Sequence, residues 1–118
     1  MRIAYLNINK AAKARARRLI DYLAGLDADL IGLGEMTRSN ADAFRDGFAA
    51  LGYRHSCFKA PDSPKGSIGV VSRNRFSQMR IAYMQSRSGH DGIPRIAQIH
   101  ERGLDLTFVY FPNHLKKI

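Results

Sequence analysis

Cysteine is almost absent from the 118-residue sequence: Cys57 is its single thiol, so no disulfide can form within the chain. A lone thiol fits a reducing compartment, and we expect Cys57 to be a small buried residue on a strand. No apolar run approaches the roughly 20 residues of a membrane-spanning helix, and the N-terminus lacks the apolar core of a secretory signal peptide. We therefore expect a cytoplasmic protein with no membrane association.

Acidic side chains are also scarce, with ten Asp and Glu against nineteen Lys and Arg. The net charge is +9 at pH 7, and the pI is near 10.2. This excess favours an anionic partner, most commonly nucleic acid, although a basic surface that merely keeps a chain in solution has the same composition. The content of 45% hydrophobic and 25% charged residues is that of a globular protein, and the length suits one domain over residues 1–118.

The sequence has no internal repeat, linker or low-complexity tract, and its first half alternates between strand and helix patterns. Segment 2–8 is apolar at both parities, which predicts a strand covered on both faces. A helix follows, with Asn9 as its expected N-cap and Gly25 as its expected end. Its apolar face holds Ala16, Leu19, Ile20 and Leu23. Segment 28–34 predicts a second strand, and a second helix is expected to end at Gly52.

The second half of the sequence predicts strands alone. The expected segments are 53–60, 67–74, 79–85, 94–101 and 104–111. Prolines and a glycine in 61–66 mark a turn, 86–92 is expected to be an exposed loop, and 102–103 a tight hairpin turn. This order predicts an α+β fold of the α/β sandwich type, with one mixed sheet of about six strands and both helices on one of its faces.

A carboxylate interrupts the apolar pattern at the end of the second strand, where "DADLIGLGEM" carries Glu35. A Glu at the edge of a core costs free energy unless something compensates its charge. A solvated strand end is the ordinary explanation of such a residue, and a bound cation is the functional one.

Three further stretches accompany "DADLIGLGEM" in a specific order along the chain. They are "IAYLNIN" with Asn7, then "GSIGVVSRN", then "LTFVYFPN" with Tyr110 and Asn113. Together the four stretches resemble the N-terminal half of the endonuclease/exonuclease/phosphatase superfamily, which has the DNase I-like and exonuclease III-like fold. Two positions depart from the family pattern: Leu6 stands where an aromatic residue is common, and Gly34 where Gln is common.

The resemblance implies half of a four-layer DNase I-like sandwich, and hydrolysis of phosphodiesters or phosphate esters with Mg²⁺ or Mn²⁺ as cofactor. It implies that Glu35 and Asn7 bind the metal and that Tyr110 and Asn113 are catalytic. The expected substrate-binding residues are Asn7, Lys10 and Arg38. Structural alternatives remain open: Asn7 and Asn113 as turn residues, Tyr110 as a core aromatic, and Lys10 as part of a solvated basic face.

The motifs of the family's second half are missing, because the sequence has no Asp-x-Asn triplet and no Asp-His pair to supply the general base. None of the four histidines has zinc-ligand spacing, although His114 would lie close to the proposed site. We therefore expect part of a Mg-dependent nuclease or phosphodiesterase that needs a second half. The alternative is a non-catalytic basic module, derived from the same fold, that binds nucleic acid or protein.

The missing half also predicts association, since half of a sandwich leaves an inner sheet face uncovered. The last expected strand is apolar at both parities, with Phe108 and Tyr110 on one side and Val109 and Phe111 on the other. Large exposed apolar patches are rare on monomers. We therefore expect a homodimer or a complex with a missing C-terminal half.

Overall fold

The computed structural model describes residues 1–9, 11–58, 66–83, 89 and 94–110. Within these ranges the helices are α1 (Lys13–Gly25) and α2 (Ala41–Ala50). The strands are β1 (Ile3–Asn7), β2 (Leu30–Met36), β3 (His55–Phe58), β4 (Ser67–Ser72), β5 (Ser77–Tyr83), β6 (Pro94–Glu101) and β7 (Leu104–Val109). The described helices include none that is long and apolar enough to cross a membrane. The expected loop at 86–92 lies outside the described residues except at position 89.

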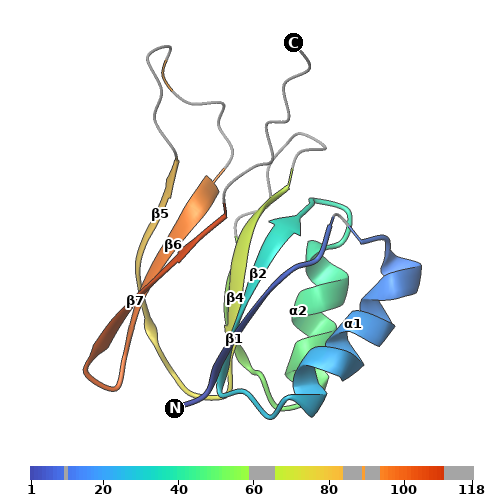
Figure 1. Ribbon diagram of the computed structural model, residues 1–118, viewed down its shortest axis with the longest axis horizontal. Helices are drawn as coiled ribbons and strands as arrows, with labels where there is room; N and C mark the ends of the chain where they lie inside the picture. The colour runs from blue at the N-terminus through green and yellow to red at the C-terminus, as the bar shows by residue number, and fades with distance from the viewer. Residues whose placement is uncertain (10, 59–65, 84–88, 90–93, 111–118) are drawn as a thin grey trace.

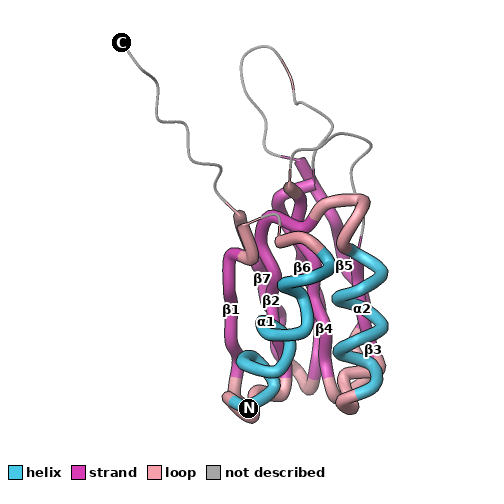
Figure 2. The backbone as a smooth tube through the Cα atoms, turned by 90° about the vertical axis from the view of Figure 1, so that its right-hand side faces the viewer, coloured by secondary structure: helices cyan, strands magenta, loops and turns pink. Residues whose placement is uncertain are grey.

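Four strands form the first sheet, in the order β1-β2-β4-β3. β1 and β2 run parallel and are joined through α1, whereas β4 is antiparallel to both β2 and β3. Both helices cover the same face of this sheet (Figures 1 and 2). β4 is buried along its whole length, as expected for a strand that has layers on both faces.

The helix-side core forms because each helix presents one apolar stripe to the first sheet. Ile20 and Leu23 of α1 and Phe44 and Phe48 of α2 are buried in one cluster with residues of β2. The ring of Phe48 meets that of Tyr53 edge-on, with centroids 5.5 Å apart. This packing binds the helices to one face of the sheet and leaves its other face to a different layer.

That other face is covered by β5, β6 and β7, which form a separate antiparallel sheet (Figure 1). Ala97 and Ile99 of β6 are buried in a second cluster with Leu30, Val70 and Phe108, which belong to β2, β4 and β7. Cys57 of β3 is buried in the same cluster, as the sequence predicted. The layers are therefore helices, a four-stranded sheet and a three-stranded sheet.

The α+β class and the placement of both helices on one face are confirmed, whereas the expected single mixed sheet is wrong. Seven strands divide into two sheets, because the chain leaves the first sheet after Ser72 and begins β5 at Ser77 in a new layer. β1 is an edge strand with alternating exposure, so the expectation that both of its faces are covered is also wrong.

The outer face of β7 is more polar than the sequence suggested. The Asp105 carboxylate lies 2.7 Å from Nδ1 of His100, and Nε2 of Gln98 donates to the Thr107 hydroxyl at 3.3 Å. These cross-strand pairs of β6 and β7 can face water without cost, so the expectation that neither face of the last strand is polar is wrong.

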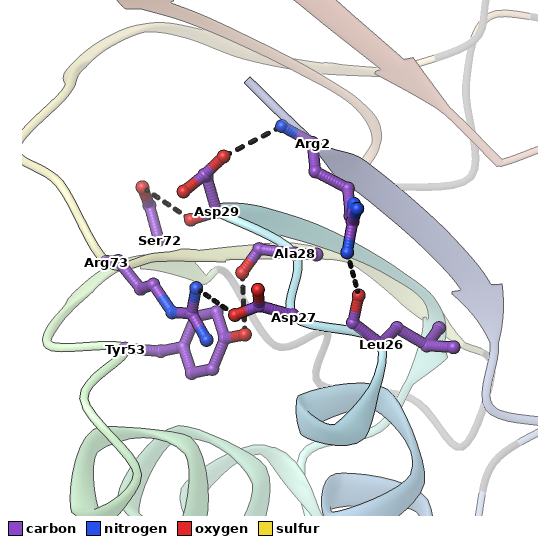
Figure 3. A network of polar contacts seen from close by, with 8 residues as sticks. All are labelled: Arg2, Leu26, Asp27, Ala28, Asp29, Tyr53, Ser72 and Arg73. Atoms are coloured by element: carbon purple, nitrogen blue, oxygen red, sulfur yellow. Dashed lines mark hydrogen bonds and ion pairs between the residues drawn. The ribbon is translucent and has the colours of Figure 1, made fainter.

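A polar network closes the end of the first sheet at which β2 begins (Figure 3). The backbone N–H of Arg2 donates to Oδ2 of Asp29 at 2.7 Å, and this bond is the main cause of the lowered pKa of Asp29. Arg73 pairs with Asp27 at 2.7 Å, and the Tyr53 hydroxyl donates to the carbonyl oxygen of Ala28 at 2.6 Å. These contacts hold the strands in register at this end. Glu35 lies at the opposite end of β2.

Candidate functional site

Glu35 occupies a β-bulge at the far end of β2. Gly34 lies opposite Ile68 of β4 and Met36 opposite Ser67, so Glu35 is the extra residue in the ladder. Its φ is 59°, in the left-handed region. This conformation costs a residue other than glycine on the order of 1 kcal/mol or more. Strain at a polar residue on a strand end is a reason to suspect function there.

Gly66, immediately before β4, is the residue that permits this bulge. A Cβ atom on Gly66 would lie 2.8 Å from both the carbonyl carbon and the Cβ of Glu35, and closer still to its Cα. No larger residue fits there unless the Glu35 backbone moves. The glycine that opens "GSIGVVSRN" is therefore a requirement of the Glu35 conformation.

Two side chains from other strands hold one oxygen of the Glu35 carboxylate. The hydroxyl of Tyr110, directly after β7, donates to Oε1 at 2.7 Å. Nδ2 of Asn7, the last residue of β1, donates to the same oxygen at 3.1 Å. Within the described ranges no side chain or backbone group donates to Oε2. The structure thus brings together three of the predicted site residues, from three strands and both sheets.

The turn after β1 orients the Asn7 amide. Its Oδ1 accepts the backbone N–H of Asn9 at 2.8 Å, which leaves the NH₂ group facing Glu35. Asn9 has a φ of 51° and is not the N-cap predicted for the first helix, because α1 begins at Lys13 and Ala12 is its N-cap. The amide that closes the turn is therefore the same one that contacts the carboxylate.

Tyr110 is a buried donor, with 8% of its surface exposed. Burial, followed by the hydrogen bond to Glu35 and the negative charge of that residue, raises the pKa of Tyr110 to about 12. The phenol therefore keeps its proton at neutral pH and stays a donor. Tyr110 is therefore a core aromatic whose hydroxyl contacts Glu35, and its catalytic role stays a prediction.

Two residues at this end of the sandwich were not predicted. Arg95 of β6 is 6% exposed; its carbonyl accepts the backbone N–H of Tyr110 at 2.8 Å, and its charge opposes the rise of the Tyr110 pKa. A cation that shares the inward parity of β6 with Ala97 and Ile99 was a signal for Arg95. Tyr5 of β1 has a pKa raised by burial and then by the Glu35 charge. An aromatic residue on a strand is ordinary, so the sequence carried no signal for Tyr5.

Of the remaining predicted site residues, the structure describes Arg38, which is exposed in the turn after β2. Lys10 and Asn113 lie outside the described residues, as does His114, so their roles stay predictions. The described part of the chain contains no cluster of three or more His, Cys, Asp or Glu residues able to hold a metal ion.

The layer order and strand topology match larger proteins of the DNase I-like fold. An AP endonuclease from Archaeoglobus fulgidus gives a TM-score of 0.65 at 18% identity, over 93% of this chain and 40% of its own. An endonuclease/exonuclease/phosphatase from Beutenbergia cavernae DSM 12333 gives 0.63 at 19% identity, over 91% and 36%. D. rerio TDP2, complexed with a single-strand DNA product, gives 0.60 at 21% identity, over 91% and 43%.

The sequence itself identifies the family. Residues 4–114 match the model of the Endonuclease/Exonuclease/phosphatase family. The chain therefore belongs to this family, as its four motifs predicted. It spans between 36% and 43% of the length of the three solved structures named above. No curated protein sequence matches it.

Proposed function

We propose that this chain is the metal- and phosphate-binding half of a Mg²⁺- or Mn²⁺-dependent phosphodiesterase or nuclease. The observation that carries the proposal is the Glu35 carboxylate, which stands in a strained bulge with Oε1 held by Tyr110 and Asn7. A carboxylate held in this way costs folding free energy, and a bound cation offsets that cost. Membership of the family supports the same class of reaction.

The oxygen atoms at this site are suitable ligands for a hard divalent cation. Glu35 offers Oε2, and Oδ1 of Asn7 keeps one lone pair besides the one used by Asn9. Mg²⁺ is usually held by one or two carboxylates, with water and phosphate oxygens completing its shell. The described residues supply few such oxygens, so weak binding is expected. When bound, the cation would polarise the phosphoryl oxygen and neutralise charge on the departing oxygen.

The side chains of this chain would orient the site and hold the substrate. Tyr110 and Asn7 fix one carboxylate oxygen of Glu35, so that the other keeps a constant direction. Tyr110 and Asn113 are the proposed catalytic residues: Asn113 would donate a hydrogen bond to phosphate, and Tyr110, whose single hydroxyl proton goes to Glu35, would orient that carboxylate beside the phosphate. Asn7, Lys10 and Arg38 are the proposed substrate-binding residues. The basic excess of the chain supports the assignment of the two cations to phosphate contacts.

A second polypeptide segment completes the site in this proposal. Among the described strands, β1 and β7 end the two sheet orders, and the ring of Tyr5 on β1 stacks on that of Phe108 on β7. The β1 and β7 edges therefore lie on one side of the sandwich, where Ile3 is 43% exposed. We propose that a missing C-terminal half covers this side and supplies the general base. A homodimer is the alternative occupant.

Nucleic acid is the proposed substrate class. The net charge of +9 supports this assignment, as does the single-strand DNA product carried by one of the structurally similar proteins. The alternative function is a non-catalytic basic module that binds nucleic acid or protein, which the same charge favours. The two functions differ in whether a metal binds at Glu35.

Mn²⁺ titration followed by electron paramagnetic resonance tests the proposal. Wild type is expected to bind Mn²⁺ weakly, Glu35→Gln to lose this binding, and Asp46→Asn, a change at an exposed carboxylate of α2, to keep it. Plasmid cleavage by the chain alone is expected to be absent or very low. Equal Mn²⁺ binding by wild type and Glu35→Gln would leave the binding module as the better description. Robust Mg²⁺-dependent cleavage that Glu35→Gln abolishes would show that no second half is needed.

A further inference from the structure

The Tyr5 side chain lies along β2, on the face toward the three-stranded sheet, and points to the candidate site. In the parallel register, Tyr5 lies beside Gly32 and Asn7 lies beside Gly34. A Cβ on Gly32 would meet Cδ2 of the Tyr5 ring at 2.8 Å, and a Cβ on Gly34 would meet its Cζ at 3.2 Å and its hydroxyl closer still. The ring therefore runs from Gly32 to Gly34, and its hydroxyl lies against the residue that precedes Glu35.

Packing holds the ring in this direction. The Phe108 ring lies at 14° to that of Tyr5, with centroids 6.4 Å apart. The space for the Tyr5 hydroxyl exists because Gly34 has no side chain, and a Cβ atom at this position would overlap the hydroxyl. Tyr5 and Gly34 are therefore a matched pair: the small residue makes room for the large one.

The Tyr5 hydroxyl is a donor that nothing uses within the described part of the chain. The Tyr110 hydroxyl, by contrast, is committed to Glu35. Tyr5 as a whole is 42% exposed, so its side chain is partly open to solvent. A tyrosine hydroxyl carries its proton at neutral pH. A fixed and protonated hydroxyl beside an anion-binding position is placed to donate to that anion.

We propose that Tyr5 is a substrate-binding residue whose hydroxyl donates a hydrogen bond to a non-bridging phosphate oxygen of a nucleic-acid strand. This inference rests on the proposed function, in which Glu35 would hold a divalent cation at the phosphate-binding site. Tyr5 and Asn7 share one face of β1, with Cα atoms about 7 Å apart along the strand. The two β1 side chains would thus contact the phosphate from one side, while Tyr110 borders it from the other sheet.

Oligonucleotide binding with and without Mn²⁺ tests this role. Fluorescence anisotropy of a labelled oligothymidylate gives the affinity in each condition. The gain in affinity caused by Mn²⁺ reports binding at the candidate site, because binding to the basic surface needs no metal. Tyr5→Phe keeps the ring and removes the hydroxyl. Tyr22→Phe is the matched control, since Tyr22 lies on α1 and is 62% exposed. The Mn²⁺-dependent gain is expected to fall about tenfold in Tyr5→Phe and to stay unchanged in Tyr22→Phe.

A gain in Tyr5→Phe within about twofold of wild type overturns the inference. Tyr5→Leu distinguishes the hydroxyl from the ring: a loss in Tyr5→Leu alone indicates stacking on a base and contradicts the hydroxyl role. Gly34→Ala reaches the same contact from the other side, because its Cβ would displace the Tyr5 hydroxyl, and it is expected to reduce the gain as Tyr5→Phe does.

Two outcomes separate this inference from the proposed function. If wild type gains no affinity from Mn²⁺, both fail. If the gain is present and lost in Glu35→Gln but intact in Tyr5→Phe, the proposed function stands and the role of Tyr5 alone is rejected.

Discussion

The hydroxyl of Tyr110 donates a 2.7 Å hydrogen bond to Oε1 of Glu35, between residues 75 positions apart in the sequence. Tyr110 follows the last strand of the three-stranded sheet, and Glu35 stands in the bulge of the four-stranded sheet. The bond therefore ties the two sheets together at the end that carries the candidate site. It also makes the direction of the carboxylate depend on how the sheets are packed.

Replacing Tyr110 by Phe should lower the free energy of unfolding by about 1–3 kcal/mol. The change removes the hydroxyl but keeps the buried ring, so the loss reports the bond to a charged acceptor. Urea denaturation monitored by circular dichroism measures it. Tyr22→Phe on the exposed face of α1 is the control and should change stability by less than about 0.5 kcal/mol. An unchanged stability in Tyr110→Phe would mean that the bond does not hold the sheets together in solution.

Alkaline pH should weaken the fold through the same residue. Burial and the bond to Glu35 raise the pKa of Tyr110 from its ordinary value of 10.0 to about 12 in the folded chain. Below the lower value both states are protonated and the stabilisation is complete; between the two values the unfolded phenol loses its proton first, so stability falls as pH rises. Urea midpoints at about pH 9 and about pH 11 should therefore differ more for wild type than for Tyr110→Phe. Equal differences would show that Tyr110 does not carry this pH dependence.

Gly66→Ala should destabilise the chain by about 2 kcal/mol or more, because the new Cβ would overlap the Glu35 backbone. Gly25→Ala is the matched control: a Cβ there meets nothing within 4 Å, and alanine favours the helix. Thermal melting compares the two variants. Gly66→Ala should also lose Mn²⁺ affinity, since the bulge aims the carboxylate. Wild-type stability in Gly66→Ala would mean that the bulge is not needed.

The side of the sandwich formed by β1 and β7 should promote association. Light scattering of the purified chain at micromolar concentration is expected to give a mass above the 13.2 kDa of one chain. Ile3→Lys places a charge on the exposed face of β1 and should restore the mass of one chain. Leu51→Lys, an equally exposed apolar position beyond α2, should have no such effect. A stable wild-type monomer would contradict the expected homodimer and leave a different polypeptide as the partner.

The positions of helices and strands were predictable because they follow from patterns that are short in sequence. The apolar spacing that predicted the first helix is the one that buries Ala16, Ile20 and Leu23 in α1. The family motifs were equally local, so Asn7, Glu35 and Tyr110 could be selected before their contacts were known. Helix starts were predicted less well, since Asn9 turned out to serve the Asn7 amide instead of a cap.

The sequence by itself determined the order of the elements, the family and the three residues that meet at the strand ends. Tertiary structure decided that the strands form two sheets, that Glu35 sits in a bulge backed by Gly66, and that Tyr5 extends toward Gly34. The physical reason is the distance along the sequence between the residues that interact. A pattern of apolar residues fixes which face of a strand is buried, but not which strand lies beside it or which ring fills the space above a distant glycine. Those outcomes depend on pairing and packing between residues far apart in the chain.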